Sequence, residues 1–188
     1  MKALASKEER ERLRKRNQVV VGVILVFLMV ASTIGYAIQG NLGSSGNKDP
    51  DKLTYNGSEF TNQNGFWVLG NFVFKYNPKE TPSVGEGLKK IQEYQGKPLY
   101  IQSENENAEA EIYVNLGQVA ERVQKACVEN TNCSGGLPIK TCNDNFIIIK
   151  ESEIDSISQI DGCVYIEGSK EDLVKLADQF LFKILGIK

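Results

Sequence analysis

The stretch FIIIKESEIDSISQIDGCVYI, residues 146–166, decides the fold of this chain. Residues 146–149 are a continuous apolar run, residues 154–160 alternate in part, and residues 163–166 follow Asp161-Gly162, a dipeptide typical of tight hairpin turns. We predict three strands of one sheet, with the last two joined by that turn. The first and third strands then run in the same direction.

The clearest predicted helix follows this sheet. Ser169 and Asp172 have the spacing of an N-terminal cap, and Gly186 suits the C-terminal end. Six apolar residues recur at helical spacing between them: Leu173, Leu176, Ala177, Phe180, Leu181 and Ile184. We expect this face to cover the sheet.

Upstream, residues 53–76 contain short aromatic and β-branched runs separated by Asn56-Gly57, Asn64-Gly65 and Gly70-Asn71. Such dipeptides favour hairpin turns, so a meander of three or four strands is expected. The aromatic side chains fit either a ligand platform or a strand face packed on the core, and core packing is the more common use.

The middle of the chain is predicted with weaker signals. Residues 83–96 have helical spacing interrupted by Gly85 and Gly87, and residues 98–102 resemble a strand. Residues 103–111 are expected to form an acidic loop, with a short strand at 110–114 and a helix from Asn115 to about residue 128. Neither a phosphate-loop nor a calcium-loop spacing is present in these segments. The fold class is therefore α+β, an N-terminal β-meander and a C-terminal three-stranded sheet packed by about three helices.

Four cysteines, Cys127, Cys133, Cys142 and Cys163, follow the meander. An even number suggests two disulfides in an oxidising compartment, whereas a zinc site normally has shorter paired spacings. Free structural thiols are the other alternative. Because Cys142 and Cys163 lie at the same end of two parallel strands, we prefer a Cys142–Cys163 bond, with Cys127 bound to Cys133. Crossed pairing of Cys127 with Cys163 and of Cys133 with Cys142 remains open.

The N-terminal segment indicates a membrane protein. Residues 1–17 form a basic tail, and residues 18–39 are long and apolar enough for one transmembrane helix. Residues 40–52 are a Gly, Ser, Asn and Asp linker, and residues 53–188 are one domain. The positive tail places the N-terminus in the cytoplasm and the domain outside the cell membrane. A cleaved signal peptide, ending near Gly35-Tyr36-Ala37, is the alternative.

Composition excludes several classes of function. The chain has no histidine, which removes Ser-His-Asp and Cys-His catalysis and histidine-based zinc sites. The portion after residue 40 carries more Asp and Glu than Lys and Arg, which argues against nucleic acid as a partner. No motif implies a cofactor or a metal. Asn56 and Asn132 begin N-x-S/T sequons in predicted turns and are candidate glycosylation sites.

Several segments also carry a resemblance: Cys127, Asn132-Cys133, PIKTC at 138–142, IIIK at 147–150, CVYIEG at 163–168 and FLFKILGI at 180–187. Together they resemble small, uncharacterised membrane-anchored proteins of archaeal genomes. The resemblance covers residues 53–187 and implies an anchored, cysteine-bonded architecture. It implies no activity and no functional residue.

Three functions are compatible with these features. The first is a single-pass membrane-anchored module outside the cytoplasm that binds a protein or an envelope component, or assembles with itself. The second is an envelope enzyme using carboxylate or Lys chemistry. The third is a thiol-disulfide redox protein, although the cysteine spacing lacks the C-x-x-C pattern of reactive pairs. The absence of any catalytic pattern favours the first.

Overall fold

The computed structural model describes Leu25 and residues 51–129 and 136–188. The predicted basic tail, almost all of the predicted transmembrane helix and most of the linker lie outside the described residues, as do Asn132 and Cys133. No helix within the described ranges has both the length and the hydropathy needed to cross a bilayer. The chain divides into residues 1–48 and a compact unit of residues 49–188.

The predicted meander is confirmed as a four-stranded antiparallel sheet. Its strands are β1 (Lys52–Tyr55), β2 (Ser58–Gln63), β3 (Phe66–Leu69) and β4 (Phe72–Phe74), paired in that order. Both residues of the Asn56-Gly57 turn have positive φ, 45° and 79°. That is the backbone conformation that closes a two-residue hairpin with the twist of its strands.

The predicted three-stranded sheet is wrong in strand number, because five strands form one sheet in the order β10-β11-β9-β5-β6. They are β5 (Pro98–Ser103), β6 (Arg122–Lys125), β9 (Asn145–Glu151), β10 (Ser156–Ile160) and β11 (Cys163–Gly168). β9 and β11 run parallel as predicted, and β10 pairs antiparallel with β11 at the edge. β5 joins through parallel pairing with β9, a contact between segments more than 40 residues apart that local patterns do not reveal. A separate ladder pairs β7 (Cys127–Val128) with β8 (Ile139–Lys140).

The two described α-helices are α2 (Glu106–Leu116) and α3 (Leu173–Ile184). α3 matches the predicted C-terminal helix. The expected acidic loop is wrong, since these residues form α2. The Asn105 side chain accepts hydrogen bonds from the backbone N–H groups of Asn107 and Ala108, and acidic residues in a first turn are favourable.

Two other predicted helices are also wrong. Asn115 does not begin a helix but lies in the last turn of α2, and residues 122–125 are strand β6. The segment 83–96 contains only a 3-10 turn at Ile91–Glu93. Gly85 and Gly87 adopt φ of +87° and +68°, which a continuous right-handed helix does not allow. The domain therefore has two α-helices, α2 and α3, and one 3-10 turn within its described residues, where three helices were expected.

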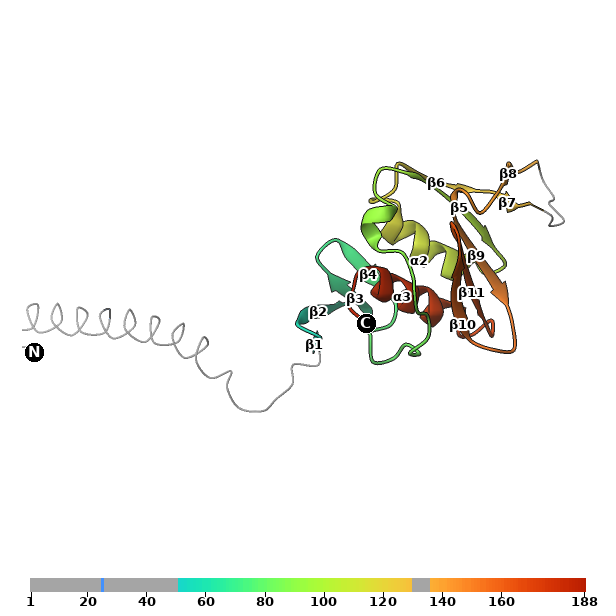
Figure 1. The fold of residues 1–188 in the computed structure, drawn as a ribbon. Helices are drawn as coiled ribbons and strands as arrows, with labels where there is room; N and C mark the ends of the chain where they lie inside the picture. The colour runs from blue at the N-terminus through green and yellow to red at the C-terminus, as the bar shows by residue number, and fades with distance from the viewer. Residues whose placement is uncertain (1–24, 26–50, 130–135) are drawn as a thin grey trace, which may run out of the picture. The chain divides into compact units, whose positions relative to one another are not determined.

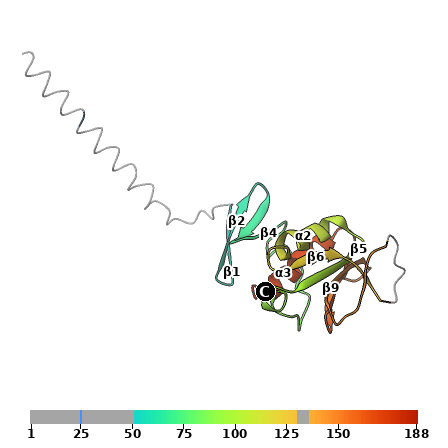
Figure 2. The ribbon, with the colours of Figure 1, turned by 90° about the horizontal axis from the view of Figure 1, so that it is seen from above.

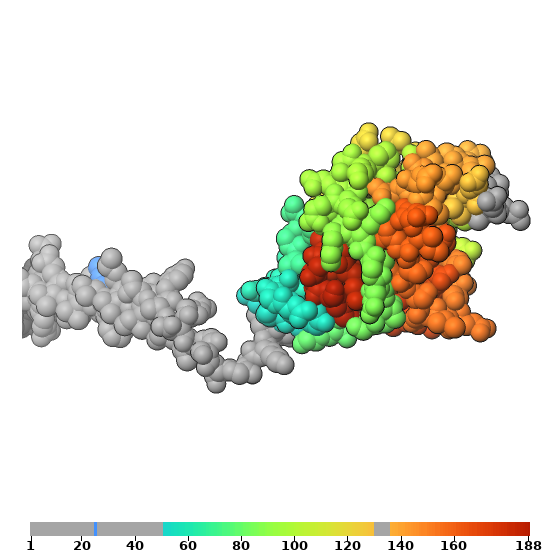
Figure 3. Space-filling view, in the orientation of Figure 1, coloured from blue at the N-terminus to red at the C-terminus, as the bar shows by residue number. Residues whose placement is uncertain are grey.

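The helices lie between the two sheets (Figures 1 and 2). α3 contacts β9, β10 and β11 on one side, and α2 contacts β4 and β5. On the other side of α3, Phe182 packs against Phe60 and Phe74 of the meander, with ring centroids 5.8 and 4.5 Å away. In the space-filling view, the red C-terminal segment is visible only through an opening between the first sheet and the green segments (Figure 3). The larger of two hydrophobic clusters therefore joins both sheets through α3.

Candidate functional site

The disulfide Cys142–Cys163 is confirmed, with an S–S distance of 2.09 Å and a Cα–Cα distance of 4.8 Å. It ties the turn before β9 to the first residue of β11, and Cys163 is fully buried. Cys127 is also disulfide-bonded, whereas Cys133 lies outside the described residues. Because Cys163 is bound to Cys142, the crossed pairing of Cys127 with Cys163 is wrong. Among the described residues, no cluster of three His, Cys, Asp or Glu could hold a metal ion.

Asn56 occupies an exposed hairpin turn, but its side chain is engaged. Its Nδ2 donates a hydrogen bond of 3.0 Å to the backbone oxygen of Ile187, near the C-terminal end of α3. Attachment of a glycan to Nδ2 would have to preserve or replace this bond. Glycosylation of Asn56 stays a prediction, and so does that of Asn132.

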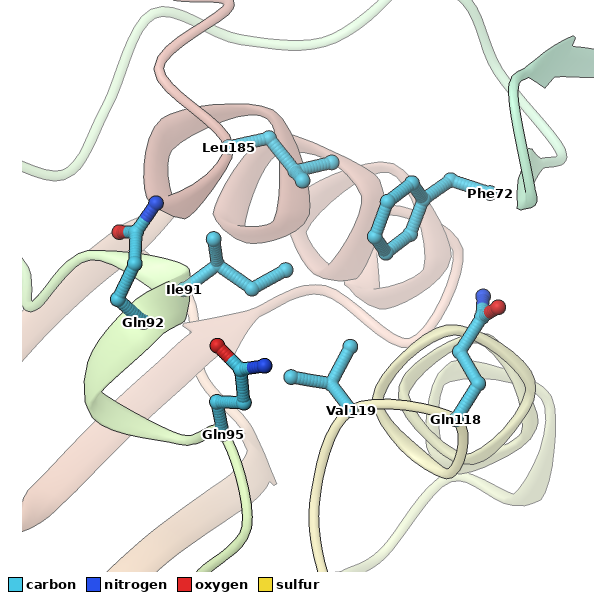
Figure 4. A pocket seen from close by; sticks show the side chains of 7 residues that line it. All are labelled: Phe72, Ile91, Gln92, Gln95, Gln118, Val119 and Leu185. Atoms are coloured by element: carbon cyan, nitrogen blue, oxygen red, sulfur yellow. The ribbon is translucent and has the colours of Figure 1, made fainter.

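A pocket of about 270 Å³ lies where β4, the 3-10 turn and the ends of α2 and α3 meet. Figure 4 shows its side chains. Gln92 and Gln95 extend from the region of the 3-10 turn, and Gln118 extends from the end of α2 on the opposite side. Four apolar side chains complete the lining: Phe72, Ile91, Val119 and Leu185. The lining contains no titratable group, so its polarity comes entirely from carboxamides.

The carboxamides of this pocket are largely available to a ligand. Gln118 Nε2 donates a 2.8 Å hydrogen bond to the backbone oxygen of Asn71. The Oε1 of Gln118 is left to accept a hydrogen bond from a ligand. Within residues 51–129 and 136–188, the side chains of Gln92 and Gln95 form no hydrogen bond. Both are exposed, and each carries two donors and an acceptor. The pocket therefore presents neutral donors and acceptors around an apolar floor.

Tyr94 lies between the two available glutamines in the chain and is buried. Its ring packs edge-on against Phe180 at 6.3 Å, and its hydroxyl group has no hydrogen-bond partner in the described part of the protein. Burial raises the pKa of Tyr94, and the nearby charge of Glu93 raises it further. The phenol is therefore neutral and unsuited to act as a base.

A second pocket, of about 440 Å³, lies between the outer side of α2, the start of α3 and the residues after β4. It is lined by Phe66, Lys75, Tyr76, Asn107, Ala110, Glu111 and Val174. Beside Glu111 is Asp178, one turn of α3 beyond Val174 and fully buried. Asp178 Oδ2 accepts a 2.7 Å hydrogen bond from the backbone N–H of Tyr76.

The pKa values of Glu111, which lines this pocket, and of the adjacent buried Asp178 are both raised. Asp178 Oδ1 is buried and receives no hydrogen bond from an N–H or hydroxyl group of the described residues, so a bond to Glu111 requires a proton on one carboxyl group. Burial and the charge of Glu111 raise the pKa of Asp178 to about 9. Burial also raises the pKa of Glu111, while Lys75 opposes the rise. Both shifts favour a proton on this pair at neutral pH.

Charged groups also anchor the opposite face of the five-stranded sheet. The buried Tyr100 accepts a 3.1 Å hydrogen bond from Arg122 Nη2, and Lys140 Nζ lies 4.5 Å from the centre of its ring. Lys140 and then Arg122 lower the pKa of Tyr100. These contacts attach β8 and β6 to β5.

The sequence named no individual residue of the two pockets as a binding residue, although Phe66, Phe72 and Tyr76 belong to the aromatic segment 53–76 that was considered as a ligand platform. Asp178 had one available signal, because a carboxylate interrupts an otherwise apolar helix beside Ala177. The glutamines gave none, since Gln92, Gln95 and Gln118 come from two separate segments whose meeting depends on the fold. The cysteine prediction succeeded because parallel strands placed its residues at one end of a sheet.

The described unit is thus an α+β domain with a helix layer between two sheets. Its pockets include the neutral pocket and the pocket lined by Glu111 beside the buried Asp178, here called the acid-pair pocket. No protein-family model, curated protein or solved structure matches this chain.

Proposed function

We propose that this protein is a single-pass membrane-anchored binding module whose domain lies outside the cytoplasm. The basic tail before residues 18–39 supports the orientation. The Cys142–Cys163 disulfide is in keeping with an oxidising compartment. The module uses the neutral pocket of Figure 4 to hold a sugar unit of an uncharged envelope polysaccharide.

One observation carries the choice of binding over catalysis. The pocket combines three carboxamides with four apolar side chains and has no acid, base or nucleophile in its lining. Such a set can form hydrogen bonds with hydroxyl and acetamido groups while the apolar side chains cover a sugar face, but it cannot transfer a proton. The small volume suits one ring of a longer chain.

Binding to neutral trisaccharides of glucose, mannose and N-acetylglucosamine tests this proposal. Saturation-transfer NMR on the full chain in detergent should show contact with at least one of them. Gln95→Ala should weaken that binding at least tenfold without loss of folding, because the Gln95 side chain forms no hydrogen bond with described residues. Gln124→Ala, on the exposed side of β6, is the matched control. No contact with any of the three, or equal binding by Gln95→Ala, would contradict the proposal.

A further inference from the structure

The acid-pair pocket differs from the neutral pocket in the groups that it offers. Its lining includes Glu111, next to which the buried Asp178 lies. Phe66, Tyr76 and the cationic Lys75 also line it. A carboxyl pair, aromatic faces and one ammonium group thus converge on a volume within the usual range for small-ligand sites.

The aromatic walls already attract ammonium groups. Lys75 Nζ lies 4.9 Å from the centre of the Phe66 ring, and Lys175 Nζ lies 5.7 Å from the centre of the Tyr76 ring. Both distances fall within the range of cation–π attraction. Lys175 is paired with Asp172, whereas Lys75 forms no ion pair within the described residues. Lys75 is therefore a cation at the pocket that has no fixed anionic partner.

Within the described residues, Asp178 Oδ1 is buried without a hydrogen-bond partner, and the raised pKa of Asp178 favours a proton on this pair. A ligand ammonium group placed on Glu111 would replace this proton and allow both carboxyl groups to ionise beside a positive charge. The backbone N–H of Tyr76 would continue to support Asp178 Oδ2.

A ligand that pairs with both the carboxyl groups and Lys75 must carry one positive and one negative charge. A simple amine would meet the carboxyl pair but also the unpaired charge of Lys75, and a simple acid would meet Lys75 but also the carboxyl pair. We propose that this pocket binds a free amino acid with an apolar side chain, its ammonium group on Glu111 and its carboxylate on Lys75. Phe66, Ala110 and Val174 supply the apolar surface for the side chain. Binding releases the proton shared by Glu111 and Asp178 to the solvent.

Calorimetric titration of the full chain in detergent with L-leucine tests this inference. Leucine should bind at pH 7, and titrations in buffers of different ionisation enthalpy should show the release of close to one proton per ligand. The matched amine (3-methylbutylamine) and the matched acid (4-methylpentanoate) should each bind at least tenfold more weakly. Failure of leucine to bind, or equal binding of the amine, would overturn the proposal.

Variants then locate the site. Glu111→Gln should abolish proton release and weaken leucine binding at least tenfold, and Lys75→Gln should weaken binding at least tenfold while leaving proton release intact. Glu106→Gln, an exposed carboxylate on the same helix, is the matched control and should bind normally. Phe66→Ala changes an exposed residue of the pocket lining and replaces Glu111→Gln as the test variant if Glu111→Gln does not fold. It should weaken leucine binding several-fold. Unchanged leucine affinity in all three pocket variants would overturn the assignment. Gln95→Ala should leave leucine binding unchanged, which separates this outcome from that of the polysaccharide test.

Discussion

The shared proton of Glu111 and Asp178 makes an unusual prediction about stability and pH. The pKa of Asp178 is raised from 3.8 to about 9 in the folded protein. The folded state therefore keeps a proton that the unfolded chain loses above about pH 5. Since the folded state binds more protons across this window, the free energy of unfolding must fall as the pH rises. This trend is opposite to that produced by an ion-paired carboxylate.

The size of the effect follows from the linkage relation. One extra bound proton changes the free energy of unfolding by about 1.4 kcal/mol per pH unit, so a loss of up to about 3 kcal/mol is expected between pH 6 and pH 8. That is a large part of a domain stability of about 5–15 kcal/mol. The chain has no histidine, so no ordinary side chain masks the slope in this range. Lys75 faces the pair from the segment after β4 and opposes part of the rise in the pKa of Glu111.

Asp178→Asn isolates the effect. The amide oxygen can accept the hydrogen bond from the Tyr76 N–H, and the amide nitrogen can donate to Glu111 without a shared proton. We expect this variant to lose most of the slope between pH 6 and pH 8 and to exceed the wild type in stability at pH 8 by about 2 kcal/mol. The gain should be smaller at pH 6.

Denaturant unfolding followed by the fluorescence of Trp67, the single tryptophan, measures these differences. Asp51→Asn, at an exposed residue beside β1, is the matched control and should keep the wild-type slope. A wild-type stability that is flat or rising between pH 6 and pH 8 would refute the shared proton. A variant less stable than the wild type at pH 8 would refute the claim that a neutral group is preferred at residue 178.

Four further outcomes are expected. Tyr94→Phe should raise the free energy of unfolding by about 1 kcal/mol, because it removes a buried hydroxyl group without a described partner; calorimetric melting that shows a loss of stability would contradict this. Gly162→Ala should destabilise the domain by about 2 kcal/mol or more, since its Cβ would collide with the backbone oxygens of Cys142 and Asp144; an unchanged melting temperature would count against the close approach. Reduction of the Cys142–Cys163 bond opens a loop with a sequence separation of 21 and should cost about 3 kcal/mol, seen as a lower melting temperature in reductant than in a matched oxidised sample. Protease added to intact cells stripped of any wall should remove residues 40–188, and full protection of that part would refute the proposed topology.

The predictions that succeeded rest on local signals. Asn-Gly and Asp-Gly turns fix hairpins through the φ values that only a few residues adopt readily, so the meander and the β10–β11 hairpin could be predicted. The helical spacing of apolar residues within 173–184 is also a local signal, and it predicted α3. The disulfide prediction needed only the direction of two nearby strands.

The predictions that failed depended on competition between local signals. The sequence pattern predicted a helix that starts at Asn115 and placed Asn105 in an acidic loop, whereas Asn105 is the N-terminal cap of α2. Tertiary contacts decide the case: the Asn115 side chain is buried and hydrogen-bonds both the N–H and the carbonyl of Val73, at 2.8 and 2.6 Å. Asn115 thus lies in the last turn of α2, where its side chain is bound to β4 and does not cap a helix.

The sequence by itself determined the secondary structure of both ends of the domain and the parallel direction of β9 and β11, and it favoured the Cys142–Cys163 bond while leaving the crossed pairing open. Only the tertiary structure showed that α3 is covered on two sides. Asp178 and Gln179 are polar and would be expected to face solvent, yet both are fully buried beneath the chain that follows β4. Gln179 there accepts a hydrogen bond from Thr81 and donates one to Val84. A hydrophobic repeat reports how one helix buries its own apolar face, but it carries no information about which distant segment packs on the other face. Both pockets lie where such distant segments meet.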